Sequence, residues 1–146
     1  MLKALFDTTI LVSAFLAPQG LAAQLLDLVR RGALTLYLSD GVLIETQETL
    51  LQEEHIRERY EYQDQAVYDF IQGLRVVGQL VTDLPALTGV CRDPDDDYVI
   101  ACALAASVSH LVTRDKDLLI LGTYQNVAMI RPEEFIRIVR EQAAKT

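Results

Sequence analysis

Short continuous apolar runs alternate with amphipathic stretches along the whole chain. Such runs predict buried β-strands, and they fall at residues 2–6, 34–38, 110–113 and 127–130, with a further short strand within 78–84. The stretches between them carry apolar residues at helical spacing, for example Leu21, Leu25 and Leu28. Strands that alternate with helices are typical of a parallel sheet covered on both faces, so we predict an α/β/α sandwich.

The helical stretches have recognisable ends. Longer helices are expected at 21–32, 42–54, 55–78, 93–109 and 132–144, and shorter helical pieces at 7–20 and 115–121. Gly32 is a helix stop, and Pro132 suits the first position of the last helix. Ser39 or Asp40 is expected to cap the helix that follows it. We interpret the aromatic residues within 55–78 as helix-packing side chains in preference to a platform for stacked bases.

Composition predicts one globular domain over residues 1–146, since 51% of the residues are hydrophobic. No apolar run approaches about 20 residues, and the first residues lack a secretory pattern, so we expect a cytoplasmic protein outside the membrane. The net charge of −8 argues against a protein that coats nucleic acid non-specifically. It does not exclude a nuclease, because an acidic metal site itself contributes negative charge.

Acidic residues follow the predicted strands. They are Asp7 after the first strand, Glu45 on the helix after the second, four aspartates within 93–97 at a helix start, and Asp115 and Asp117 after the strand at 110–113. The carboxyl ends of parallel strands share one edge of the sheet, where ligands bind, so these acids can converge. Convergent carboxylates need a cation to stay charged, and oxygen ligands suit Mg²⁺, with Mn²⁺ as the alternative. The pattern therefore predicts a metal site that activates water for hydrolysis.

Helix capping is the competing interpretation of the same acids. Asp93 is a good N-cap, Pro94 fits the first helical position, and Asp96 falls where an acid completes a capping box. Asp115 or Asp117 could cap the helix that follows them. Capping accounts for one or two acids within 93–97 but does not require four, so the combination favours a metal site.

Three segments resemble the motifs of PIN-domain nucleases. They are LFDTTILVSAFLAPQG near the start, LSDGVLIETQETL, and CRDPDDDYVIACALAASVSHLVTRDKDLL. The similarity covers essentially the whole chain in the expected order, and it is closest to the bacterial branch of VapC-type toxins of toxin–antitoxin systems. The resemblance implies a PIN-like fold and a Mg²⁺-dependent endoribonuclease that hydrolyses RNA. It also implies a homodimer and a small antitoxin protein as partner.

The resemblance further implies roles for individual residues. The catalytic acids would be Asp7, Glu45, Asp96 and Asp115, and the metal ligands Asp7, Asp96, Asp115 and Asp117. Glu45 would complete a second ion site or orient the attacking water. Thr113 matches a Ser/Thr that supports the site, and Asp93 is expected beside it as the helix cap. The candidates for phosphate contacts are Arg92, Arg114 and Lys116, although charge balance beside the acids explains these three equally well.

The chain departs from the family pattern at Thr9, where the family commonly has Asn. Threonine has no amide donor, so it cannot copy all the hydrogen bonds of asparagine, but its hydroxyl can orient Asp7 or reach substrate. This departure keeps open a second hypothesis, a catalytically weak or inactive PIN scaffold that acts through a protein or RNA partner. An aspartate-nucleophile phosphatase is less consistent with the sequence, because such enzymes usually show Asp-x-Asp where this chain has Asp-Thr-Thr.

Overall fold

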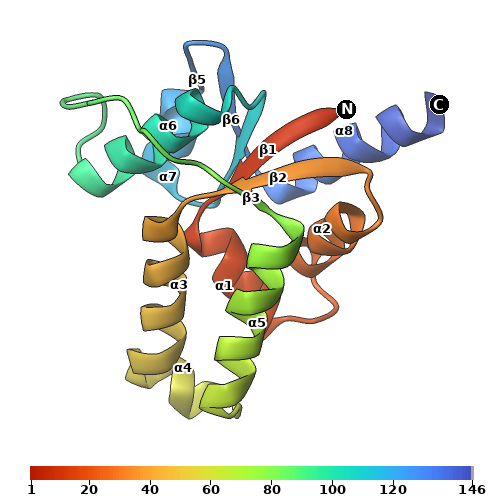
Figure 1. Cartoon of the computed structure of the whole chain (residues 1–146), viewed down its shortest axis with the longest axis vertical. Helices are drawn as coiled ribbons and strands as arrows, with labels where there is room; N and C mark the ends of the chain where they lie inside the picture. The colour runs from red at the N-terminus through yellow and green to blue at the C-terminus, as the bar shows by residue number, and fades with distance from the viewer. Residues whose placement is uncertain (146) are drawn as a thin grey trace.

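Strands form a single six-stranded sheet in the computed structural model, which describes residues 1–145 (Figure 1). They are β1 (Leu2–Phe6), β2 (Leu34–Leu38), β3 (Gln79–Leu80), β4 (His110–Val112), β5 (Thr123–Tyr124) and β6 (Val127–Ile130), in the spatial order β3-β2-β1-β4-β6-β5. Neighbouring strands are parallel except β5, which pairs antiparallel with β6. The predicted α/β/α architecture is confirmed, but the sheet is mixed and not wholly parallel.

The helices cover this sheet, and their bounds differ from the prediction in places. They are α1 (Thr8–Leu16), α2 (Leu21–Arg30), α3 (Asp40–Gln52), α4 (Glu54–Arg59), α5 (Asp64–Val77), α6 (Pro94–Ala106), α7 (Lys116–Leu121) and α8 (Pro132–Lys145). The helical material expected over 55–78 forms two helices, because the backbone becomes extended at Tyr60 and separates α4 from α5. Figure 1 shows α3 and α5 side by side below the sheet, with α4 at their far end. Ser39, and not Asp40, caps α3 by accepting from the Val42 N–H at 3.2 Å.

The order of the strands decides which face each helix covers. From β1 the chain moves outward through β2 to β3, and it then returns past β1 to β4 and continues outward to β6. Because parallel crossovers are right-handed, this reversal puts α6 and α7 on the face opposite to α1 and α2. The contacts agree, since α6 packs against β1, β2 and β4 while α2 packs against α1, β2 and α8. The reversal point lies between β1 and β4, where open α/β sheets bind their ligands.

The central strands are mostly apolar because helices cover both of their faces. Leu5 and Phe6 of β1 and Leu111 of β4 have no exposed surface. On α1, Phe15 packs edge-to-face on Tyr62, with 4.9 Å between the ring centroids, and also on Phe70 of α5. This supports the helix-packing interpretation of those two aromatic residues.

No single helix within residues 1–145 is long and apolar enough to cross a membrane; α1 and α2 pass that test only as a pair bent by 97°.

Candidate metal centre

Asp7 is a buried carboxylate held by hydrogen bonds at the carboxyl end of β1. It caps α1, and its Oδ1 accepts from the Ile10 N–H at 3.2 Å and from the Thr9 hydroxyl at 2.6 Å. Its Oδ2 accepts a short hydrogen bond from the hydroxyl of Thr113. Burial raises the pKa of Asp7 to about 6, the charge of Asp115 adds to the rise, and the hydrogen bonds oppose it. The protein itself therefore orients this carboxylate.

Two threonine hydroxyls join the end of β1 to the end of β4. Thr113 is fully buried, and the oxygen that donates to Asp7 also accepts from the Asp115 N–H at 2.9 Å. The hydroxyl of Thr9 donates to Asp7 and accepts from the Arg114 N–H at 3.2 Å. Thr9 thus orients Asp7, as the sequence allowed, and both loops are held in one hydrogen-bonded unit.

Three further acids converge beside Asp7, and we call them the acidic trio: Asp96, Asp115 and Asp117. One carboxylate oxygen from each lies within 4.8 Å of the others. Asp96 comes from the first turn of α6, Asp115 caps α7, and Asp117 lies in the first turn of α7. Carboxylates this close repel one another unless a cation lies between them.

Asp96 is the most buried member of the acidic trio, with 8% of its surface exposed. Burial raises its pKa to about 6, and the charges of Asp115, Asp93, Asp117 and Asp7 raise it further in that order. Its carboxylate accepts no hydrogen bond within residues 1–145, so the predicted capping box is not formed. No hydrogen bond therefore occupies the carboxylate oxygens of Asp96, which face those of Asp115 and Asp117.

The remaining acids of 93–97 have separate roles. Asp93 is the helix cap, as predicted, and accepts from the Asp95 N–H at 2.9 Å. Asp97 is buried and accepts from the Cys91 N–H at 2.7 Å, which ties the preceding loop to α6. Asp95 is exposed. Spacing in the sequence could not separate the roles of Asp95 and Asp97, because the direction of each side chain depends on the loop that packs against α6.

Comparison with known proteins identifies the family. Residues 3–117 match the family model described as the PIN domain. The chain belongs to the PIN-domain family. This confirms the resemblance found in the sequence, and PIN domains are generally nucleases. No curated protein sequence matches the chain.

Solved structures share the fold of this PIN domain. The crystal structure of PAE2754 from Pyrobaculum aerophilum is 15% identical over 96% of each chain, with a TM-score of 0.63. A crystal structure of VapBC2 from Rickettsia felis, bound to a DNA fragment from their promoter, is 16% identical over 89% of this chain and 98% of that chain, with a TM-score of 0.56. At such low identity these similarities concern the fold alone.

Glu45, the other predicted catalytic acid, does not join the acidic trio of this PIN domain. It lies exposed on the second turn of α3 and forms no hydrogen bond or ion pair with the residues that the structure describes. The start of α3 is nevertheless held against α6, because the hydroxyl of Tyr98 accepts from the Gly41 N–H at 3.2 Å. A Cβ at position 41 would lie 2.5 Å from that hydroxyl. In the sequence, the glycine at position 41 was the only sign of this contact between α3 and α6.

The three predicted phosphate contacts differ in their surroundings. Arg92 is 85% exposed and contacts both carboxylate oxygens of Asp117, at 3.1 and 3.2 Å. Arg114 pairs with Glu133 of α8 at 2.6 Å. Lys116 is exposed and forms no ion pair within residues 1–145. Charge balance therefore accounts for both arginines in the free protein, whereas Lys116 is left without a partner carboxylate.

Proposed function

We propose that this PIN domain is a metal-dependent endoribonuclease of the VapC type. The observation that carries the proposal is the acidic trio, in which three carboxylates from two helix starts meet beside the buried Asp7. The donor set fits Mg²⁺ or Mn²⁺, because it offers carboxylate oxygens alone and leaves room for water ligands. Asp96, Asp115 and Asp117 would hold the ion, with Asp7 as a further ligand. When bound, such an ion lowers the pKa of a coordinated water and neutralises charge on phosphate.

The chain's own residues set up this site before any ion binds. The hydroxyl of Thr113 holds Asp7 and the backbone of Asp115 in one arrangement. The hydroxyl of Thr9 supports the same carboxylate, and Thr9 thereby takes over part of the role expected of the family's asparagine. Burial of Asp7 and Asp96 keeps bulk water from screening their charges, and this strengthens their attraction for a cation. Glu45 is the proposed residue that orients the attacking water or joins a second ion site.

RNA is the proposed substrate, and a small antitoxin and a second copy of the chain are the proposed partners. Support comes from the VapC-like motifs in the sequence and from the fold shared with VapBC2. The alternative is a catalytically weak scaffold that works through a partner, and the Thr9 substitution motivates it. The hydrogen bond from Thr9 to Asp7 favours the active enzyme.

A cleavage assay tests the proposal directly. Purified protein is incubated with single-stranded and structured RNA, and with single-stranded DNA, in Mg²⁺, in Mn²⁺ and in chelator. We expect metal-dependent cleavage of RNA that falls at least about 100-fold in Asp96→Asn, since loss of mere outer-shell partners of a metal costs 10–100-fold. The matched control is Asp95→Asn, which removes the same charge one residue away from an exposed side chain. Cleavage that persists in chelator or in Asp96→Asn would refute the metal site.

Calorimetry with Mn²⁺ separates the enzyme from the scaffold. The enzyme should bind the ion in the wild type and in Asp95→Asn but not in Asp96→Asn. Absence of binding at millimolar Mn²⁺ would favour the scaffold. A small protein encoded by the neighbouring gene, co-purified with the chain and inhibiting its cleavage, would identify the antitoxin.

A further inference from the structure

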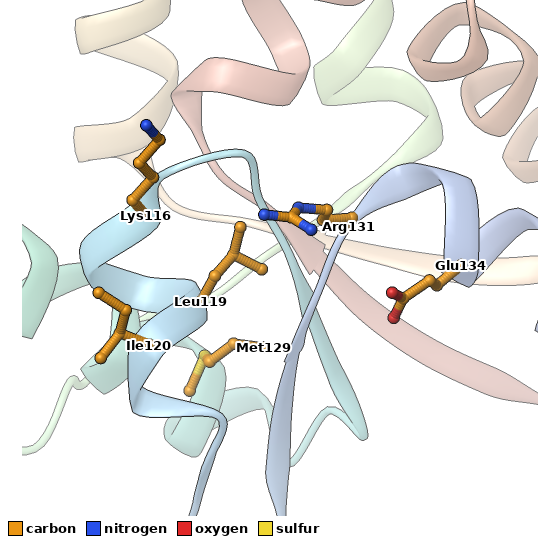
Figure 2. Close-up of a pocket in the computed structure, with 6 residues that line it drawn as sticks. All are labelled: Lys116, Leu119, Ile120, Met129, Arg131 and Glu134. Atoms are coloured by element: carbon orange, nitrogen blue, oxygen red, sulfur yellow. The ribbon is translucent and has the colours of Figure 1, made fainter.

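A groove lies between α7, β6 and the start of α8 (Figure 2). Its volume is about 470 Å³, and it is lined by Lys116, Leu119, Ile120, Met129, Arg131 and Glu134. This volume lies within the range of pockets that bind small ligands. Lys116 stands between Asp115 and Asp117 in the chain, so one residue that lines the groove is a direct chain neighbour of two proposed metal ligands, although neither of these acids lines the groove itself.

Two cations, Lys116 and Arg131, stand at this groove outside any ion pair within the described part of the chain. Figure 2 shows the guanidinium of Arg131 reaching from the start of α8 toward α7, and Lys116 extending from the first turn of α7. Both side chains are exposed, and neither forms an ion pair with a residue in the described part of the chain, although the charge of Arg131 helps to lower the pKa of Glu133. The chain carries a net charge of −8, so carboxylates are abundant. Cations left unpaired on such a surface indicate an anionic ligand.

The groove also has an apolar surface. Ile120 is 83% exposed, Leu119 is half-buried, and Met129 of β6 is 8% exposed. These side chains lie below the two cations in Figure 2, while Glu134 lies on the wall formed by α8. A single nucleotide combines an anionic phosphate with a flat base, and so it matches this groove. Its phosphate would contact the two cations, and its base would cover the apolar side chains. The carboxylate of Glu134 could accept from an exocyclic amino group of that base.

We propose that the groove is a nucleotide subsite for the RNA strand that is cut at the acidic trio. Lys116 and Arg131 bind the phosphate next to the scissile one, and Leu119, Ile120 and Met129 contact its base. This inference rests on the proposed function, because that function supplies RNA as the substrate class. An acidic peptide shares the negative charge, but the position of Lys116 between two acids of the trio favours the substrate strand.

Binding measured without cleavage tests the subsite. A fluorescently labelled RNA oligonucleotide is titrated with the full chain in chelator, and its anisotropy is followed at several salt concentrations. Lys116→Ala/Arg131→Ala should lower the affinity about tenfold or more at low salt and reduce the salt slope by roughly one to two. The matched control Arg31→Ala/Arg137→Ala removes the same charge from exposed side chains outside the groove and should stay within about twofold of the wild type. Ile120→Ser should weaken binding with an unchanged salt slope.

The outcomes distinguish failure of the subsite from failure of the nuclease. If RNA is cleaved in Mg²⁺ but the groove variant binds like its control, the subsite is wrong and the nuclease stands. If RNA binds through the groove but is never cleaved, the subsite stands and the nuclease is wrong. Groove-dependent binding of a labelled poly-glutamate peptide, together with no groove-dependent binding of RNA, would overturn the nucleotide assignment. Equal melting temperatures of the variants confirm that folding is unaffected.

Discussion

Asp7 and the acidic trio lie at the same edge of the sheet but are stabilised in different ways. Asp7 accepts hydrogen bonds from two threonine hydroxyls and one backbone N–H. Asp96 accepts none within residues 1–145, and its main neighbours are other carboxylates. Hydrogen bonds to the charged form oppose the effect of burial at Asp7, whereas no hydrogen bond within the described chain does so at Asp96.

This difference separates the part of the site that the fold itself completes from the part that requires a ligand. The threonine network holds Asp7 and the loop after β4 whether or not an ion is present. The acidic trio is a strained arrangement of like charges that a cation would relax. Stability measurements with and without metal can therefore test each part separately.

Metal binding should produce the largest effect. Mn²⁺ at about 100 times its Kd should stabilise the fold by about 2.7 kcal/mol, which raises the Tm by about 5–10 °C in a domain of this size. Asp96→Asn should abolish the shift and Asp95→Asn should retain it, as followed by thermal denaturation against a chelator blank. An equal shift in both variants would place the ion elsewhere.

Thr113→Val should produce the next largest effect. The substitution keeps the volume but leaves a buried oxygen of Asp7 and the Asp115 N–H without their partner, at a cost of about 1–3 kcal/mol in the free energy of unfolding. Urea denaturation in chelator measures it. Thr9→Val is the matched comparison and should cost less, because Thr9 is exposed and water can replace its hydroxyl. Equal costs would mean that burial of the network is not what stabilises it.

The pH dependence of the metal-free protein should be smaller. The folded-state pKa of Asp96 is about 6, against an ordinary value of 3.8. The folded protein therefore binds this proton more tightly than the unfolded chain, and the associated stability is present below pH about 4 and lost as the pH rises through about 6. Asp96→Asn should exceed the wild type in stability by on the order of 1 kcal/mol at pH 7.5, and the gap should narrow as the pH falls and close below pH about 4. A gap independent of pH would contradict this account.

Glu45→Gln should have the smallest effect on stability. Glu45 is exposed and unpaired within residues 1–145, so the free energy of unfolding should change by no more than about 0.5 kcal/mol. The Mn²⁺-induced shift in Tm should remain, while RNA cleavage should fall, but by less than in Asp96→Asn. Loss of the Mn²⁺ shift in Glu45→Gln would instead make Glu45 a ligand of the same ion.

Much of the fold could be read from the sequence because its central strands are buried on both faces. Burial makes β1, β2, β4 and β6 continuous apolar runs, which stand out from the amphipathic helices. The two residues of β5 are too few to leave a pattern, and the break between α4 and α5 has no Gly or Pro to mark it. The cap at Ser39 was one of two candidates, and only the Val42 hydrogen bond distinguishes it from Asp40.

The sequence alone determined the alternation of elements, the family motifs and which acids follow strands. It could do so because burial and helix capping leave local patterns. Only the tertiary structure decided which acids meet. Asp7 and Thr113 are 106 residues apart, and they meet because β1 and β4 are neighbouring parallel strands that end at the same edge of the sheet. The same packing turns Asp97 toward the loop and Asp96 toward the acidic trio, and it opens the groove between α7 and α8. Such choices depend on contacts between distant segments, which no local pattern records.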